Sequence, residues 1–298
     1  VQEAATAGQS LAGEDLAELD LSGLQLARLD FRGARMSKTD FSGCKLDGSD
    51  LREGDLTGAN LTGTGLTLAK LDDADLTGAK LAGAKLVGVS LRAATLDGLD
   101  LSGADLTGCD GDRASFAKTI LTGAKFDHAR LNRADFTGAN LEDARFPGAT
   151  LSAAQCEGAK AKGVNCEGAD LTGIHGSGSD FTGGKFHQVR AAGAIFAHST
   201  LDGADFSGAA LEKAQFGDSS LNGTKFDGAD LRGAMFDDAL MIKASLTKAN
   251  ALRAGFDRAD LSDADCRGTN FFEAGFWDAV TERANFRDAN LTRTLLRG

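Results

Sequence analysis

The chain has 298 residues with 39 Gly, a single Pro, no Tyr and 18 Phe, and its 32 basic and 43 acidic side chains give a formal net charge of −11. No apolar run approaches the ~20 residues that a membrane-spanning helix needs, and no basic start leads into an apolar signal segment, so we expect a cytoplasmic protein without a membrane partner. The net acidity argues against direct nucleic-acid binding, which needs a basic face to neutralise phosphates.

Residues 1–9 carry no periodic pattern and are predicted to form an N-terminal arm or cap, whereas residues 10–298 follow one five-residue period. From Leu11 to Leu296 every fifth residue is the centre of a repeat, and 49 of the 58 centres are Leu, Phe or Met, with no insertion or deletion in the series. A phase held over this length is typical of a solenoid, in which each repeat contacts only its neighbours. The sequence therefore predicts a single repeat domain over residues 10–298.

Each repeat has further regular positions around its centre. A small side chain stands two residues before the centre at 51 of 57 places, and residues two apart in an extended segment point to the same face. The small residue and the centre are therefore expected to point inward. Gly stands two residues after the centre at 30 of 58 places, which suits a corner with positive φ. An α-helix could not keep a five-residue repeat on one face, so the pattern predicts an all-β structure.

Many repeats read Ala-Asn-Leu-Thr-Gly or Ala-Asp-Leu-Thr-Gly, as at residues 59–63 and 104–108. In this pattern the chain resembles the pentapeptide repeat family over roughly residues 10 to 298. The resemblance implies a right-handed β-helix of square cross-section, with one repeat on each side and four repeats in each coil. The expected fold class is therefore all-β, a right-handed quadrilateral β-helix of about 14 twenty-residue coils.

The phenylalanines support a coil of four repeats independently of the resemblance. Thirteen of the 18 fall on two series spaced by twenty, and the two series are offset by ten residues, which is half a coil. We therefore expect two stacked aromatic ladders on opposite inner walls. The first series is Phe116, Phe136, Phe196, Phe216, Phe236, Phe256 and Phe276, and the second is Phe126, Phe146, Phe186, Phe206, Phe226 and Phe286.

Acidic residues concentrate on two adjacent sides of the expected coil. We number the sides in chain order, so that Leu11, Leu16, Leu21 and Leu26 are the first centres of walls 1, 2, 3 and 4, and each wall recurs once in every coil. Wall 2 has 5 basic and 13 acidic residues, and wall 3 has 5 basic and 10 acidic residues. The other two walls are nearly balanced, with 10 basic and 8 acidic residues on wall 4 and 12 basic and 11 acidic residues on wall 1. The acidity of the chain is therefore predicted to lie on walls 2 and 3.

Two places depart from the regular core. Leu19, Leu24 and Leu29 are large where small residues are usual, and they are expected to plug the interior at the N-terminal end. The coil of residues 156–176 has unusually small centres, including Gly176. Because cavities in a core are costly, we expect this coil to narrow, bend or be filled by neighbouring side chains rather than to leave a void.

The C-terminal end is the best candidate for an interaction site. The chain begins with Val1 and the repeat runs almost to the last residue, so we expect either a module of a longer protein or a partner, including a second copy in a homodimer, that covers the last coil. Apolar residues also occupy outward positions near this end, and an apolar surface cluster usually marks an interaction site. The predicted partner-binding residues are Met235, Leu240, Ile242, Leu252, Phe272, Trp277, Val280 and Leu295.

The sequence contains no candidate catalytic, cofactor-binding or metal-binding residue. The four His lie at outward positions without a second His or a Cys at metal-ligand spacing. The five Cys occupy inward positions and are predicted to be buried thiols in a reducing compartment. A disulfide between Cys156 and Cys166 would require opposite walls to lie unusually close.

The pattern therefore favours a non-enzymatic scaffold that binds a protein partner at its C-terminal end or on a flat wall. The family resemblance suggests a more specific role, in which the chain is a module of a bacterial adaptor for a secretion system such as type VI. It also suggests an alternative, a DNA-mimicking inhibitor or protector of a type II topoisomerase such as DNA gyrase. Thirteen net charges on walls 2 and 3 are sparse beside B-DNA, which carries one charge per ~1.7 Å, so we place this alternative second.

Overall fold

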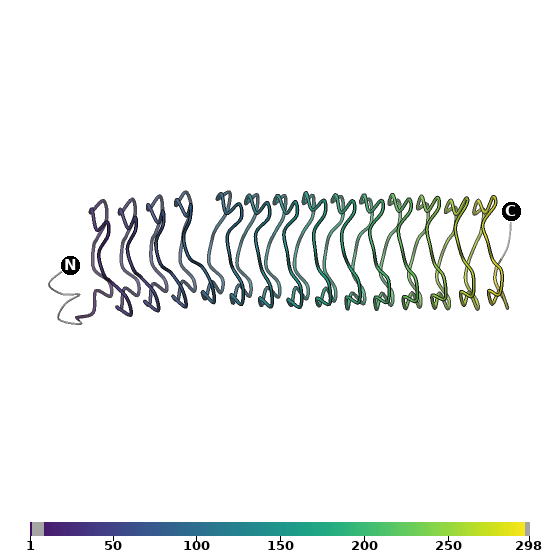
Figure 1. The fold of residues 1–298 in the computed structure, drawn as a ribbon, viewed down its shortest axis with the longest axis horizontal. Coiled ribbons are helices and arrows are strands. Elements are labelled where there is room, and N and C mark those ends of the chain that lie inside the picture. The colour runs from purple at the N-terminus through teal and green to yellow at the C-terminus, as the bar shows by residue number, and fades with distance from the viewer. Residues whose placement is uncertain (2–8, 296–298) are drawn as a thin grey trace. The chain divides into compact units, whose positions relative to one another are not determined.

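The computed structural model describes residue 1 and residues 9–295, and within these it has neither a helix nor a strand longer than one paired residue. In most repeats the residue before the centre instead forms parallel β-bridges with the residues 20 positions before and after it in the chain. This register gives coils of four repeats, which can be followed as successive turns of the trace (Figure 1). The structure is thus the expected all-β, right-handed quadrilateral β-helix.

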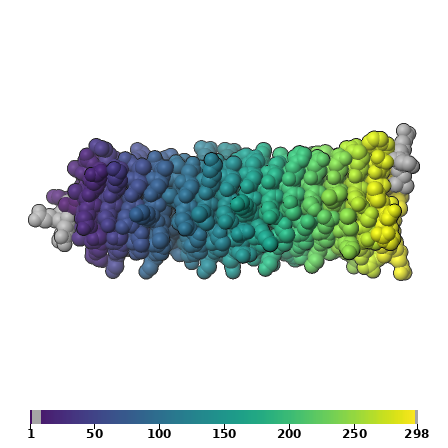
Figure 2. Space-filling view, turned by 90° about the horizontal axis from the view of Figure 1, so that it is seen from above, coloured from purple at the N-terminus to yellow at the C-terminus, as the bar shows by residue number. Residues whose placement is uncertain are grey.

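The chain divides into two compact units, Val1–Arg145 and Phe146–Gly298, which we call unit 1 and unit 2 and describe separately. In unit 1 the bridges begin at Asp15, in unit 2 they end at Leu295, and within each unit every bridge joins residues one coil apart. Within each unit the side chains of successive coils form closely set ridges on the face drawn in Figure 2. A single domain over residues 10–298 stays a prediction, and most of the predicted arm over residues 1–9 lies outside the described residues.

The backbone N–H groups of a repeat are all accounted for. In the repeat centred on Leu56, three N–H groups donate to carbonyls of neighbouring coils at 2.8–3.1 Å, and the Ala59 N–H donates to the Leu56 carbonyl at 2.9 Å to close the turn. The fifth, on Thr57, donates to the Asp55 carboxylate at 3.0 Å. The frequent Asp or Asn before the centre therefore caps the one N–H that the β-helix leaves free.

A second kind of cap reaches across to the next coil. At eight of the nine places where Asp follows the centre, its carboxylate accepts the N–H of the residue 20 positions later, and the residue 18 positions later is Ser, Gly or Arg. The exception is Asp127, because residue 147 is Pro and has no N–H to donate. The Ser hydroxyl and the Arg side chain donate to the same aspartate, and Gly leaves room for it. The aspartates that form this cap are Asp47, Asp72, Asp97, Asp112, Asp202, Asp227, Asp237 and Asp257.

Asp227 provides a test of this cap. Its carboxylate accepts the Thr247 N–H at 3.2 Å and also the hydroxyls of Thr247 and Ser245. Asp227→Ala should lower the free energy of unfolding by about 1 to 2 kcal/mol, because part-buried donors lose their acceptor, and it should speed hydrogen exchange of the Thr247 amide. Asp227→Asn should keep the amide protected, because Asn222 Oδ1 already accepts the Ile242 N–H at 3.2 Å. Equal exchange of this amide in the wild type and Asp227→Ala would contradict the cap.

The corners have left-handed backbone whether or not they carry Gly. The residue two after the centre has φ near +60° throughout, including many non-glycine residues such as Ala93 (φ 54°). Gly103 has φ 66°, and nothing lies within 4 Å of the position that its Cβ would take. The two residues therefore differ mainly in the intrinsic cost of this conformation for a side-chain-bearing residue.

Exchanging the residue type at these two corners should shift stability in opposite directions. We expect Ala93→Gly to raise the free energy of unfolding by about 1 kcal/mol and Gly103→Ala to lower it by a similar amount, because left-handed backbone costs a non-glycine residue roughly this much. Urea denaturation of the two variants beside the wild type measures both shifts. A loss of stability in Ala93→Gly would contradict this account of the corners.

The interior contains the two predicted phenylalanine ladders. In unit 1, Phe116 stacks on Phe136 with ring centroids 5.0 Å apart, and Phe126 packs edge-on against both at 5.9 and 6.1 Å. In unit 2 the stacks continue along both series, for example between Phe216 and Phe236 at 5.0 Å. Rings on opposite walls also meet edge-on, so the two ladders interlock across the core.

In the coil with small centres, neighbouring side chains fill the space at Gly176. A Cβ on Gly176 would lie 3.1 Å from the ring of Phe181 and 3.4 Å from that of Phe196, and Val164 and Ile174 are buried beside it. The aromatic rings therefore occupy the volume that a large centre would take. This confirms the expectation of compensation at Gly176, and for the rest of the coil the expectation stays a prediction.

The predicted N-terminal plug is only partly buried. Leu29 is buried with 9% of its surface exposed, Leu24 is half-buried, and Leu19 is 41% exposed. Leu29 therefore fills the interior as predicted, whereas the expectation for Leu19 is wrong, because its side chain keeps a large solvent-facing surface.

Candidate functional site

Five of the eight predicted partner-binding residues are exposed and three are not. Relative exposures are 41% for Met235, 48% for Leu240, 50% for Trp277, 46% for Val280 and 66% for Leu295. Three of the predicted residues are half-buried rather than exposed: Ile242, Leu252 and Phe272.

The structure brings most of these residues together around wall 2 of unit 2. Met235, Gly255, Gly275 and Leu295 follow one another in one ladder of bridges. Leu252 and Phe272 each precede one of these glycines by three residues, on the corner from wall 1. Trp277 follows Gly275 by two residues, on the corner toward wall 3. We call Met235, Leu252, Phe272, Trp277 and Leu295, with the two glycines that they surround, the wall 2 patch.

The remaining predicted residues lie on wall 3. Leu240 and Val280 both pair with Asp260, one on each side of it in the ladder. An acidic residue therefore separates them, and the apolar surface is interrupted on this wall. Ile242 lies on the corner of wall 3 away from the wall 2 patch, so it belongs to neither group.

The floor of the wall 2 patch carries no side chain, and two carboxylates explain why. A Cβ on Gly255 would lie 3.0 Å from Asp237 Oδ1, and a Cβ on Gly275 would lie 3.0 Å from Asp257 Oδ1. Asp237 accepts the Asp257 N–H at 3.2 Å, and Asp257 accepts the Trp277 N–H at 3.0 Å. Two successive cross-coil caps thus leave bare backbone beneath two carboxylates that lean over it.

Arginines cover part of the aromatic surface at the patch. The Arg258 guanidinium lies 5.5 Å from the centre of the Trp277 ring, and that of Arg293 lies 5.6 Å from the centre of the Phe272 ring. Arg258 also donates two hydrogen bonds to Asp238, at 2.7 and 2.5 Å. These cation–π contacts account for part of the burial of Phe272, and they hold both rings in place.

The electrostatics of the patch differ from one carboxylate to the next. Burial raises the pKa of the Asp237 carboxyl, and this outweighs the hydrogen bond from the Asp257 amide. Hydrogen bonds from Arg258 lower the pKa of Asp238. The charge of Asp238 is therefore balanced by Arg258, whereas at Asp237 the charge of Arg258 does not offset the effect of burial on the pKa.

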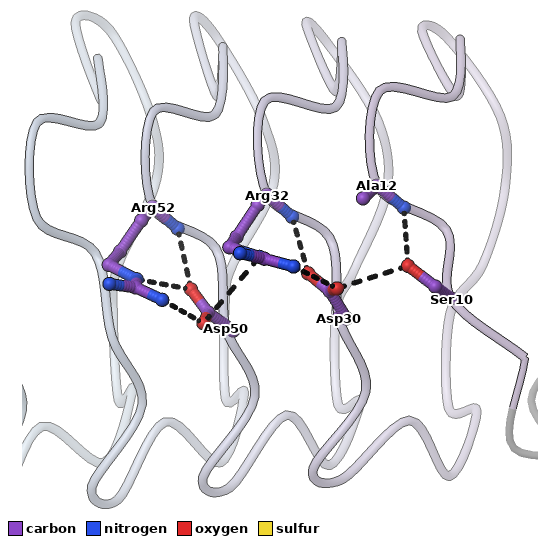
Figure 3. Close-up of polar contacts among 6 residues, drawn as sticks. All are labelled: Ser10, Ala12, Asp30, Arg32, Asp50 and Arg52. Carbon is purple, nitrogen blue, oxygen red and sulfur yellow. Dashed lines mark hydrogen bonds and ion pairs between the residues drawn. The ribbon is translucent and has the colours of Figure 1, made fainter.

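Elsewhere, many charges neutralise each other in rows along the β-helix. In unit 1, Asp30 accepts two hydrogen bonds from the Arg32 side chain and one from Ser10, and Asp50 accepts two from the Arg52 side chain (Figure 3). Each aspartate also accepts the backbone N–H of the same arginine. The Arg32 side chain hydrogen bonds hold the pKa of the Asp30 carboxyl well below its usual range. Each exposed ion pair of this kind contributes little to stability. We interpret this row as an ordinary part of the protein surface and not as a ligand site.

The other candidate groups offer little chemistry. All five cysteines are buried, and burial raises the pKa of the Cys109, Cys166 and Cys266 thiols to about 12, so these three are poor nucleophiles at neutral pH. No group of three or more His, Cys, Asp or Glu among the described residues is placed to hold a metal ion. A shallow basic groove in unit 2 includes Arg267 and Arg287, but both already pair with aspartates.

The sequence reasoning identified the apolar rim of the patch and missed its floor. Within a single repeat, none of the four floor residues stands out from the pattern; they are Gly255, Gly275, Asp237 and Asp257. The signal that could have revealed them is the 18-residue spacing from an Asp after a centre to a Gly before a later centre.

The repeat pattern also decides the family. A model of pentapeptide repeats matches the chain in overlapping segments that together run from residue 15 to residue 298. The chain belongs to the pentapeptide repeat family. A search of curated proteins finds no match.

Several solved pentapeptide repeat structures are similar to this pentapeptide repeat protein. HetL, which is involved in heterocyst differentiation regulation in the cyanobacterium Nostoc sp. strain PCC 7120, is 25% identical over 82% of this chain and 88% of its own, with a TM-score of 0.26. Trypsin-treated QnrB1, a plasmid-mediated fluoroquinolone resistance protein, is 20% identical over 76% and 91%, with a TM-score of 0.28. At these scores the superpositions support no argument about function.

A thylakoid-lumen pentapeptide repeat protein from Arabidopsis thaliana is 27% identical over 45% of this chain and 72% of its own, with a TM-score of 0.18.

The described part of the present chain, residue 1 and residues 9–295, includes no helix that is long and apolar enough to cross a membrane.

Proposed function

We propose that this pentapeptide repeat protein is a non-enzymatic scaffold that binds a protein partner through the wall 2 patch of unit 2. The observation that carries the proposal is the exposure of Trp277, Met235 and Leu295 around one bare stretch of backbone. Trp is enriched among the residues that dominate binding energy at interfaces, and a cluster of exposed apolar residues is rare on a surface without a partner. The proposal includes a cytoplasmic location and a role as an adaptor in a bacterial secretion system, which the family resemblance suggests.

The test compares two exposed apolar residues in different units. Trp277→Asp should abolish capture of a bacterial partner that the wild-type chain retains, because it places a charge in the apolar patch. Leu68→Asp is the matched control, since Leu68 is 66% exposed but lies in unit 1. The captured protein is then purified and its affinity for all three chains is measured, with circular dichroism to verify folding. Equal affinity for the wild type and Trp277→Asp would overturn the proposal.

A DNA-mimicking role against a type II topoisomerase is the second candidate. The net charges of −8 on wall 2 and −5 on wall 3 favour it. Ion pairs weaken it, because several of these acids, including Asp15, Asp238 and Asp263, already pair with arginines one coil away. A supercoiling assay with purified DNA gyrase separates the candidates. Inhibition or protection by the chain would place the topoisomerase role first.

A further inference from the structure

We propose that the wall 2 patch binds a protein segment that presents a lysine or arginine side chain flanked by apolar residues. This inference rests on the proposed function, because it specifies the chemistry of the partner at the same patch. The cation would lie above the glycine floor beside Asp237 and Asp257, and the flanking apolar groups would contact the surrounding side chains.

The glycine floor carries the carboxylates of Asp237 and Asp257 in place of side chains of its own. Gly255 and Gly275 are neighbours in one ladder of bridges, so two successive coils present backbone instead of side chains. Glycine inside a β-ladder often marks a place where a ligand or another backbone comes close. Both glycines are half-buried, which leaves part of their backbone open to a partner.

The rim supplies apolar contact around this floor. Leu295 and Trp277 are the most exposed of the rim residues, at 66% and 50%, and Met235 is 41% exposed. Met and Trp are both enriched at the buried centres of interfaces. A partner with apolar side chains next to its contact point would cover these groups and remove them from water.

The negative charge of the patch favours a partner that carries a positive charge. Asp237 and Asp257 each accept one backbone N–H, and a carboxylate has room for more donors. Neither has an ion pair within the described residues, whereas the arginines nearby are engaged: Arg258 pairs with Asp238, and Arg253 and Arg293 both pair with Glu273. The charge of Arg258 also acts on Asp237 and Asp257, but its ion pair is with Asp238. A cation from a partner could therefore pair with either of these two carboxylates, and an acidic partner would be repelled.

The protein already contains a small example of the contact that we propose. The Arg258 guanidinium lies against the Trp277 ring and hydrogen-bonds Asp238 at the same time. An aromatic face beside a carboxylate thus suits a guanidinium on this surface. Asp237 and Asp257 lie next to the same rim and can receive a second cation, supplied by the partner.

The experiment selects binding sequences from a random peptide display library on the full chain. The same selection is made on two variants, Asp237→Asn/Asp257→Asn and Trp277→Asp/Leu295→Ser. The amide variant should keep the fold, because an Asn at this position can still cap the next coil, as Asn222 does for Ile242. Trp277 is the only tryptophan, so its fluorescence measures the affinity of each selected peptide at the patch.

We expect the wild type to enrich peptides with Lys or Arg between apolar residues, and the amide variant to bind them about tenfold more weakly and to lose the preference for cations. Enrichment of neutral or acidic apolar peptides that still perturb Trp277 would overturn this inference and leave the proposed function intact. Enrichment that is the same on the wild type and on Trp277→Asp/Leu295→Ser would overturn both.

Discussion

Replacing Phe216 by alanine should destabilise unit 2 by about 3 to 5 kcal/mol, the cost typical of removing a buried aromatic side chain. Phe216 is fully buried and stacks on Phe196 and Phe236 at 5.4 and 5.0 Å. It also packs edge-on against Phe206 and Phe226 at 5.8 and 5.6 Å. Alanine would remove all four ring contacts and leave a cavity that rigid neighbouring coils cannot fill.

Chemical denaturation measures the loss of unfolding free energy, and hydrogen exchange shows which coils are destabilised. In a solenoid each coil is stabilised by its neighbours, so the amides of the coils around Phe216 should exchange faster and distant coils should change little. Phe216→Leu is the matched control and should cost only about 1 kcal/mol, because leucine occupies many other centres. A loss for Phe216→Ala no larger than that of this control would show that the ladder is not closely packed.

Restoring the consensus residue at Gly176 should destabilise the protein rather than improve it. The repeat pattern alone would recommend leucine at this centre. A Cβ there would already lie 3.1 Å from the Phe181 ring, and leucine adds three further carbon atoms. We expect Gly176→Leu to lower the free energy of unfolding by about 3 kcal/mol, the upper end of the usual cost of overpacking.

A second substitution tests the cause. Phe181→Leu makes room beside Gly176, so the double variant Gly176→Leu/Phe181→Leu should recover most of the stability that Gly176→Leu loses. The two changes should therefore be strongly non-additive, as expected for residues in contact. Equilibrium denaturation of the wild type, both single variants and the double variant gives the coupling. Additive losses, or a gain in Gly176→Leu alone, would contradict the packing that we describe.

The repeat pattern also locates functional surfaces by their departures from it. Most outward positions are polar and many carry Asp or Asn, which cap the backbone. At the wall 2 patch the usual cap before the centre is replaced by Gly255 and Gly275, and the carboxylates move to Asp237 and Asp257 in the preceding coils. The same hydrogen bonds are made, but the outer surface changes from side chains on the ladder itself to glycine backbone beneath two carboxylates.

The sequence by itself determined the fold, the coil of four repeats and the inward positions of the phenylalanines, because a strict five-residue period fixes which side of an extended chain each residue faces. It also identified the exposed Trp277 and its apolar neighbours. Only the tertiary structure decided that Phe181 fills the space at Gly176 and that Asp237 leans over Gly255. These contacts join residues in different repeats, and their outcome depends on the volume and reach of individual side chains, which the period does not specify.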